Sequence, residues 1–338
     1  MNLIEIRDLC VAFNGQTVVR NLSLDVRPGE CLALVGESGS GKSVTAHSIL
    51  QLLPQAGTET LGSIKYRGQE LIGASPSTLQ KLRGNRIAMI FQEPMTSLNP
   101  LHSIEKQIGE TLLLHKGLGG KAAQARILEL LELVGIQKPQ ERLKAYPHQL
   151  SGGQRQRVMI AMALACEPEL LIADEPTTAL DVTVQQQILG LIGELVAERG
   201  MALILISHDL GVIAQNVDRM LVMYGGTVVE RGPTAEVFSA MAHPYTRGLF
   251  AARPRLNVAA PLAAGADAPG GRMRLPTIAG TVPELVDLPP GCPFAGRCGF
   301  TVPDCYPVLP PAVPLGEDHS ARCIRLDAVA AAAQEGRA

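Results

Sequence analysis

The sequence predicts an α/β fold around a mostly parallel β-sheet, because short apolar runs alternate with longer helical periods through the first 245 residues or so. Residues 31–35, 170–173 and 202–206 are continuous apolar runs of strand length, the pattern of strands buried on both faces. Apolar residues recur at helical spacing over 188–196, and Gly200 follows them. This order is typical of two parallel strands joined by a crossover helix.

Size and charge narrow the class of protein. The chain has 338 residues, 46% of them hydrophobic, which is enough for one or two globular domains with a core. Its 30 Lys and Arg residues nearly balance 32 Asp and Glu residues, so it lacks the broad positive field typical of nucleic-acid binding. No apolar stretch approaches the roughly 18 residues of a membrane-spanning helix, and residues 1–7 lack the features of a secretory signal. We therefore expect a cytosolic protein with no nucleic-acid partner.

Composition divides the chain into four predicted parts. The α/β pattern covers residues 1–245, and residues 246–290 are rich in Pro, Gly and Ala, as expected of a linker and extension. Residues 291–325 hold four of the seven cysteines but few large aliphatic residues, so a covalent or metal link is expected to order them. Residues 326–338 are expected to form a flexible tail.

A phosphate-binding loop follows the first buried run. Residues 36–43 match the pattern G-x-x-x-x-G-K-S/T, between a predicted strand and a predicted helix. The glycines let consecutive backbone N–H groups point at phosphates, beside the positive end of the following helix. Lys42 is expected to reach the β- and γ-phosphates, and the Ser43 hydroxyl to bind Mg²⁺. The loop residues expected to bind the nucleotide are Gly36, Ser38, Gly39, Ser40, Gly41, Lys42 and Ser43. The motif alone does not separate a kinase, a GTPase and an ATPase.

Two acidic residues end the apolar run at 170–173. In nucleotide hydrolases with such a loop, the first acid holds Mg²⁺ and a following glutamate can polarise the attacking water. Asp174 and Glu175 are expected to take these two roles.

Several further motifs resemble those of ATP-binding cassette (ABC) ATPases, in the order and approximate spacing of that family. They are Leu150-Ser151-Gly152-Gly153-Gln154, Gln92 in Ile90-Phe91-Gln92, Ala179-Leu180-Asp181 and His208 in Ser207-His208-Asp209. The resemblance spans residues 1–245. It implies a P-loop cassette with a RecA-like core, a small β subdomain and a helical subdomain, followed here by a Cys-rich extension.

The resemblance also implies how the site is built. In ABC ATPases two cassettes meet head to tail, and each ATP lies between the P-loop of one and the signature motif of the other. Ser151, Gly152, Gly153 and Gln154 would thus contact the γ-phosphate held by a second subunit, at the positive start of a helix. Gln92 would contact Mg²⁺ and the attacking water, His208 would hold the γ-phosphate, and Asp181 would lie at the dimer interface. Phe13 would stack on adenine, with a core position as the alternative.

Longer matches are similar to the dipeptide and oligopeptide importer subfamily, whose nickel-importing relatives share much of them. They lie at residues 91–100, 146–153, 173–185 and 243–246. This resemblance implies an ATPase that energises peptide uptake on the cytoplasmic face of the inner membrane. Its implied partners are a second ABC ATPase subunit, identical or not, two transmembrane permease subunits and, indirectly, an extracytoplasmic substrate-binding protein. A nickel-chelate or other small-solute importer is the alternative within transport, and a DNA-maintenance ABC ATPase is the alternative outside it.

Four cysteines near the C-terminus form a separate candidate site. Cys292, Cys298, Cys305 and Cys323 are spaced C-x5-C-x6-C-x17-C. The expected cytosolic location disfavours disulfides, and the spacing leaves zinc, an iron–sulfur cluster or unligated thiols open. The run Cys292-Pro293-Phe294-Ala295-Gly296-Arg297-Cys298 resembles the C-terminal extension of one type of peptide-importer ATPase. That resemblance implies a 4Fe–4S cluster on these four cysteines, with Zn²⁺ as the alternative metal.

Overall fold

The computed structural model describes residues 1–93, 97–178, 180–207, 209–252 and 277–335. These residues form two compact units, Met1–Thr227 and Val228–Ala338. Composition suggests a boundary at residue 245, but the units divide after Thr227. Glu230 and Arg247 form hydrogen bonds with His319 and Val329, so residues 228–251 belong with the C-terminal part of the chain. His208, Ala179 and residues 253–276 lie outside the described residues.

The first unit is built on a parallel sheet whose strands are among the most deeply buried in the chain. Its strand order is β9-β3-β8-β7-β6. The pairs β3–β8, β3–β9, β7–β8 and β6–β7 are all parallel. Every residue of β7 and β8 is buried, which explains their unbroken apolar sequences. The bounds are β3 Cys31–Val35, β6 Ile87–Ile90, β7 Leu170–Asp174, β8 Ala202–Ile206 and β9 Arg219–Tyr224.

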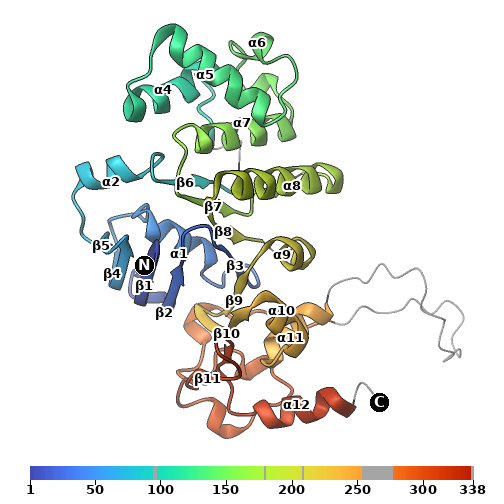
Figure 1. Cartoon of the computed structure of the whole chain (residues 1–338). Coiled ribbons are helices and arrows are strands. Elements are labelled where there is room, and N and C mark those ends of the chain that lie inside the picture. The colour runs from blue at the N-terminus through green and yellow to red at the C-terminus, as the bar shows by residue number, and fades with distance from the viewer. Residues whose placement is uncertain (94–96, 179, 208, 253–276, 336–338) are drawn as a thin grey trace, which may run out of the picture. The chain divides into compact units, whose positions relative to one another are not determined.

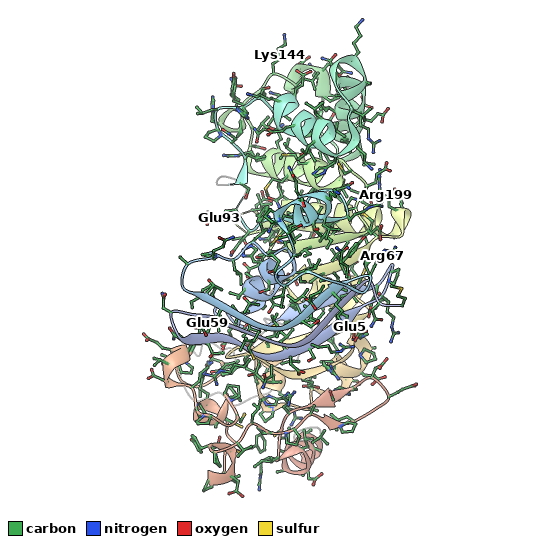
Figure 2. The ribbon with its side chains drawn as sticks, turned by 90° about the vertical axis from the view of Figure 1, so that its left-hand side faces the viewer. Glu5, Glu59, Arg67, Glu93, Lys144 and Arg199 are labelled. Carbon is green, nitrogen blue, oxygen red and sulfur yellow. The ribbon has the colours of Figure 1, made fainter. Side chains whose placement is uncertain are left out.

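A second, antiparallel sheet has the order β2-β1-β4-β5. Its strands are β1 Ile4–Phe13, β2 Gln16–Val26, β4 Thr58–Tyr66 and β5 Gln69–Glu70. Ile4 pairs with Val26 on one side and with Tyr66 on the other, so β1 is the central strand. This sheet is a small β subdomain, as the resemblance implies, and Glu5 and Glu59 mark two of its strands in Figure 2.

Helices complete the first unit. α4, α5, α6 and α7 gather at one end of it (Figure 1), where Lys144 is labelled in Figure 2. Ser103 and Ser151 cap the first turns of α4 and α7 with their side chains. No helix in the described ranges is both long enough and apolar enough to span a membrane. The bounds are α1 Lys42–Ile49, α2 Pro76–Leu82, α4 Ile104–Lys116, α5 Gly120–Leu133, α6 Pro139–Arg142, the 3₁₀ turn η1 Pro147–Gln149, α7 Gly152–Leu164, α8 Val182–Arg199 and α9 Leu210–Asn216.

The second unit is organised around a buried carboxylate, Glu230. Its side chain accepts hydrogen bonds from the backbone N–H groups of Ala242 and His243, both at 2.9 Å, and from Nε2 of His319, also at 2.9 Å. Residues 230, 242–243 and the distant His319 therefore meet at one acid. The bounds are β10 Thr227–Pro233, α10 Thr234–Ala240, α11 Pro244–Ala251, η2 Leu285–Asp287, η3 Ala295–Arg297, η4 Pro303–Cys305, β11 Val313–Pro314, β12 Ser320–Ala321 and α12 Leu326–Glu335.

The structure differs from the sequence prediction at the C-terminus. Residues 326–335 form the helix α12, where a flexible tail over 326–338 was expected. The alanine-rich sequence favours a helix, and Val329 is 2% exposed. Arg247 Nη1 donates to the carbonyl of Val329 at 2.6 Å, which fastens α12 within the second unit. Residues 246–251, expected in the linker, belong to α11.

Glu230→Gln should destabilise the second unit. Although burial raises the pKa of Glu230, hydrogen bonds from His319 and from the two backbone N–H groups outweigh burial and hold this pKa below its usual value. An amide in its place turns a donor towards these donors, so the free energy of unfolding should fall by about 3 kcal/mol at neutral pH. Urea unfolding followed by circular dichroism measures this. The exposed Glu317→Gln is the matched control, expected within about 0.5 kcal/mol of wild type.

The lowered pKa of Glu230 also predicts how its contribution to stability changes with pH. A carboxylate with a depressed folded pKa stabilises the fold above its unfolded pKa, and this stability is lost as pH falls through the folded pKa. The difference between wild type and Glu230→Gln should therefore shrink once the pH drops below about 4. A difference that stays constant from pH 7 to pH 3 would contradict this account of Glu230.

Candidate functional site

The loop between β3 and α1 has a backbone that requires glycine. Gly36 has φ +155°, and a Cβ there would lie 2.2 Å from the carbonyl oxygen of Met223. Gly41, the N-cap of α1, is in the left-handed region with φ 95°, and a Cβ there would lie 3.0 Å from the carbonyl oxygen of Val18. A side chain at either glycine would collide with the neighbouring backbone. This close approach is typical of a loop whose backbone N–H groups surround phosphates.

Lys42 lies inside this loop. Its Nζ donates to the carbonyls of Gly36 and Glu37, both at 2.9 Å, and to the hydroxyl of Ser40 at 3.4 Å. The side chain is 5% exposed. Burial lowers the pKa of Lys42, and the carboxylates of Glu175, Asp174 and Glu37 oppose that shift. A buried ammonium group held by the loop is suited to binding phosphate oxygens.

A serine hydroxyl and a carboxylate meet next to this loop. Ser43 Oγ, in the first turn of α1, donates to Oδ1 of Asp174 at 3.0 Å. Asp174 ends β7 and is 2% exposed. Burial raises the pKa of Asp174, while the Ser43 hydrogen bond and the nearby His47 and Lys42 lower it. Two hard oxygen donors at one point are the ligands that Mg²⁺ prefers, with water and substrate phosphates completing the shell.

Glu175 is held by two side chains that donate to the same oxygen. Gln92 Nε2 donates to Glu175 Oε2 at 2.9 Å, and Thr178 Oγ1 donates to it at 3.1 Å. The backbone at Glu175 is in the left-handed region with φ 45°, and its N–H donates to the carbonyl of Ile206 at 3.0 Å. Such an uncommon backbone conformation is typical of functional sites, and the two side-chain hydrogen bonds hold the carboxylate in place. A fixed carboxylate of this kind can accept a proton from water.

The signature residues form a helix cap. Gln154 N donates to Ser151 Oγ at 3.3 Å, and Ser151 N donates to Gln154 Oε1 at 3.1 Å, which makes a capping box at the start of α7. A Cβ at Gly153 would lie 3.0 Å from Val184 Cγ1, so a larger residue there would press on α8. Leu180 Cδ2 would likewise lie 3.3 Å from a Cβ at Gly152, so both glycines make room for neighbouring side chains. The positive end of α7 at these glycines suits an anion.

Asp181 caps the next helix. Its Oδ1 accepts from the backbone N–H of Val184 at 2.9 Å, in the first turn of α8. This contact lies within the chain, and the expected role of Asp181 between two subunits stays a prediction.

The described residues do not join every expected part of the site. The hydrogen bonds described for Ser151 and Gln154 lie within the start of α7, and their expected contact with a nucleotide on a second subunit stays a prediction. Phe13 ends β1 opposite Gln16 and is half-exposed, and its stacking on adenine stays a prediction. His208 lies outside the described residues, so its contact with the γ-phosphate also stays a prediction.

Sequence reasoning missed two residues near the site. Thr178 shares an oxygen of Glu175 with Gln92. His47 lies one turn after Ser43 on α1, and its ring centroid is 6.2 Å from that of Phe91. The available signals were spacings: Thr178 follows Glu175 by three residues, and His47 follows Ser43 by four, which is one turn of helix.

An apolar pocket of about 270 Å³ lies next to the residues before Gln92. Residues of β6, of the segments that flank it, of α4 and α7, and Leu50 and Leu52 after α1 line it. Phe91, in this lining, directly precedes Gln92. The lining includes Phe91, Leu98, Thr111, Met159 and Met162. Methionine side chains adapt to differently shaped apolar partners.

The four C-terminal cysteines line one small pocket, together with His243. Backbone N–H groups of Phe300 and Arg325 donate to the sulfurs of Cys298 and Cys323, at 3.4 and 3.3 Å. Burial and the other three sulfurs raise the pKa of Cys292 to about 12. Over the part of the chain that the structure describes, however, no three His, Cys, Asp or Glu side chains are arranged as a set of metal ligands. The expected cluster or zinc site thus has its residues together but no ligand geometry.

Two family models match the chain. The model described as "ABC transporter" matches residues 19–178. The model described as "Oligopeptide/dipeptide transporter, C-terminal region" matches residues 229–305, which include three of the four cysteines.

Individual proteins extend these matches to nearly the whole chain. The dipeptide transport ATP-binding protein DppD of Bacillus subtilis is 47% identical over 326 residues, covering 95% of this chain and 94% of the relative. The peptidoglycan transport ATP-binding protein YejF of Agrobacterium fabrum is 58% identical over 258 residues, 75% of this chain and 47% of YejF. A solved dimeric ATP-binding cassette in a post-hydrolysis state, bound to ADP and Pi, is 27% identical with a TM-score of 0.61, over 68% of this chain and 98% of that chain.

Gly36→Ala should impair nucleotide binding because no relaxation of a flexible side chain can relieve its contact with the Met223 carbonyl. Strain of a few kcal/mol in the loop predicts an ATP affinity at least about tenfold weaker, measured by calorimetry. Gly190→Ala, on α8 where a Cβ meets nothing within 4 Å, is the matched control and should bind ATP as wild type does. Unchanged affinity in Gly36→Ala would contradict the assignment of this loop.

Proposed function

The chain belongs to the oligopeptide/dipeptide family of ABC transporter ATP-binding proteins, and we propose that it hydrolyses ATP to energise the import of di- or oligopeptides through partner membrane subunits. The observation that carries the proposal is the arrangement at the end of β7. Ser43 and Asp174 share a hydrogen bond there, and Glu175 is held in place by Gln92 and Thr178.

In this proposal each group has one chemical task. The P-loop N–H groups and Lys42 hold the phosphates of ATP. Ser43, Asp174 and Gln92 would hold Mg²⁺, which would supply positive charge against the phosphate oxygens. Glu175 accepts the proton of the attacking water, while Gln92 and Thr178 keep its carboxylate pointed at that water. His208 would stabilise the γ-phosphate from the loop after β8.

A second ATPase subunit, identical or different, would complete each site. The capped start of α7, with Ser151, Gly152, Gly153 and Gln154, would face the γ-phosphate bound to the partner's P-loop. Asp181, at the start of α8, would lie close to that interface. The dimeric state in which the related cassette was solved with ADP and Pi supports this arrangement.

Two permease subunits are the proposed membrane partners. The apolar pocket next to Gln92 offers a surface on which an apolar segment of a permease would dock, at the cytoplasmic face of the inner membrane. Phe91 lines this pocket and precedes the residue that holds Glu175. In this proposal the docked segment would lie next to Phe91, the residue before Gln92. An extracytoplasmic substrate-binding protein would act on the permeases and not on this chain.

We also propose that Cys292, Cys298, Cys305 and Cys323 hold a 4Fe–4S cluster, with Zn²⁺ as the alternative. The four sulfurs line one pocket, and backbone N–H groups already donate to two of them, as thiolate ligands require. Burial and the neighbouring sulfurs raise the pKa of Cys292, and a bound metal would lower it. The ligand geometry would form on binding the metal.

Glu175→Gln should abolish turnover and spare nucleotide binding. The amide cannot accept the proton of the attacking water, so the rate should fall by about 10² to 10⁴. Phosphate release measures turnover, and calorimetry measures ATP binding. Glu194→Gln, an exposed substitution on α8, should leave both unchanged. A loss of only about threefold would remove Glu175 from the role of general base.

The cysteine proposal predicts metal in protein purified without oxygen. We expect about four irons per chain and visible absorbance, both of which Cys298→Ser or Cys323→Ser should diminish. Cys31→Ser, in the first unit, is the control and should keep the full iron content. Zinc in place of iron would reject the cluster and keep the four-cysteine site. Absence of both metals, with all four thiols open to alkylation in the folded protein, would reject the site.

A further inference from the structure

His243 is a buried side chain of the second unit to which the proposed function gives no task. It is the N-cap of α11 and is 1% exposed. Its backbone N–H donates to Glu230 Oε2 at 2.9 Å, and its Nδ1 accepts a hydrogen bond from the backbone N–H of Tyr245 at 3.1 Å. The backbone and the ring of His243 are therefore both held in place.

The second nitrogen of this ring has a proton to donate and no acceptor. Because Nδ1 accepts a hydrogen bond, it carries no proton, and the proton of the imidazole lies on Nε2. Burial lowers the pKa of His243 to about 4 against the opposing effects of Glu230 and the Arg322 backbone, which agrees with an uncharged ring. Nε2 is buried, and no group among the described residues forms a hydrogen bond with it. Since an unpaired buried donor costs free energy, an acceptor from outside the polypeptide would stabilise this arrangement.

His243 shares a small pocket with the four C-terminal cysteines. All four cysteines line this pocket with it, and its ring centroid is 6.1 Å from that of Phe294. The pocket has a volume of about 10 Å³, which is room for about one water molecule. Backbone N–H groups already donate to the sulfurs of Cys298 and Cys323. The Nε2–H of His243 is thus an unpaired donor on a residue whose pocket is lined by sulfur acceptors.

We propose that His243 is a positioning residue whose Nε2–H donates a hydrogen bond to a sulfur of the metal centre at the four cysteines. The inference rests on the proposed function, because it needs a metal on these thiolates. A hydrogen bond to such a sulfur offsets part of its negative charge, which stabilises the bound metal and favours the reduced form of an iron–sulfur cluster. His243 is not itself a ligand in this arrangement, because its free nitrogen carries the proton while Nδ1 is engaged by Tyr245.

Two substitutions at residue 243 separate this role from that of a helix cap. His243→Asn places an oxygen near the position of Nδ1, so it keeps the cap of α11 and removes the Nε2–H. His243→Gln places an amide N–H near the position of Nε2 and loses the cap. The measurement is the rate at which a chelator removes metal from the full chain purified without oxygen, followed by metal analysis. His102→Asn, at a histidine of the first unit that contacts Lys106, is the matched control and should behave as wild type.

The two variants should differ in a set order. His243→Asn should lose its metal about tenfold faster than wild type, the size expected for removing a hydrogen bond to a metal ligand, and His243→Gln should lose it more slowly than His243→Asn. A helix cap alone predicts the opposite order, because only His243→Gln gives up the cap. Where the metal is iron, His243→Asn should also shift the ratio of reduced to oxidised centre at a fixed potential about fivefold towards the oxidised form.

Two results would overturn the role of His243 and leave the cysteine site intact. One is equal metal loss from wild type and His243→Asn, which would mean that a buried water or the Arg322 carbonyl takes the Nε2 proton. The other is faster metal loss from His243→Gln than from His243→Asn, which would leave His243 as a helix cap. Wild-type protein that binds neither iron nor zinc would overturn the cysteine proposal itself, and the inference with it.

Discussion

The hydrogen bond between Ser43 and Asp174 is the contact on which the rest of the site depends. It joins residues 131 positions apart, at the start of α1 and the end of β7. The sheet order makes the contact possible, since β3 and β7 both pair with β8 in parallel. Parallel strands end at the same edge of a sheet, so the loop after β3 and the acids after β7 converge there.

The site contains strained backbone and buried charges, each of which costs free energy by itself. Gly36 and Glu175 both have positive φ, and Lys42 and Asp174 are charged residues in nearly buried positions. Each is compensated by named partners: carbonyls for Lys42, Ser43 for Asp174, and Gln92 and Thr178 for Glu175. Strain and buried charge gathered at one edge of a sheet are typical of a functional site. In this chain they mark the place where phosphate, metal and water would meet.

Motifs with fixed spacing were predictable from the sequence, whereas contacts between motifs were not. The strands at 31–35 and 202–206, the crossover helix and the loop at 36–43 are confirmed because each depends on local pattern and burial. The hydrogen bond from Gln92 to Glu175 and the ring contact of His47 with Phe91 join segments that no local pattern relates.

The start of α7 and the end of the chain also differ from the interpretation of the sequence, each for a local reason. Ser151 and Gln154 were interpreted as contacts to the γ-phosphate at the start of a helix, although their spacing is also that of a capping box. The end of the chain, with Ala328 to Ala333, was predicted to be a flexible tail. Alanine is also the strongest helix former, and the buried Val329 and the bond from Arg247 decide in favour of a helix.

The central claim is that ATP hydrolysis at Ser43, Asp174 and Glu175 drives peptide import. Its most direct measurement is the translocation of a labelled peptide across vesicles that carry the chain with its second ATPase subunit, permeases and substrate-binding protein. The account predicts translocation only when Mg²⁺ and ATP are present on the side of the chain, and none when a non-hydrolysable analogue replaces ATP. Equal translocation with the analogue, or steady ATP hydrolysis without translocation of any peptide, would contradict it.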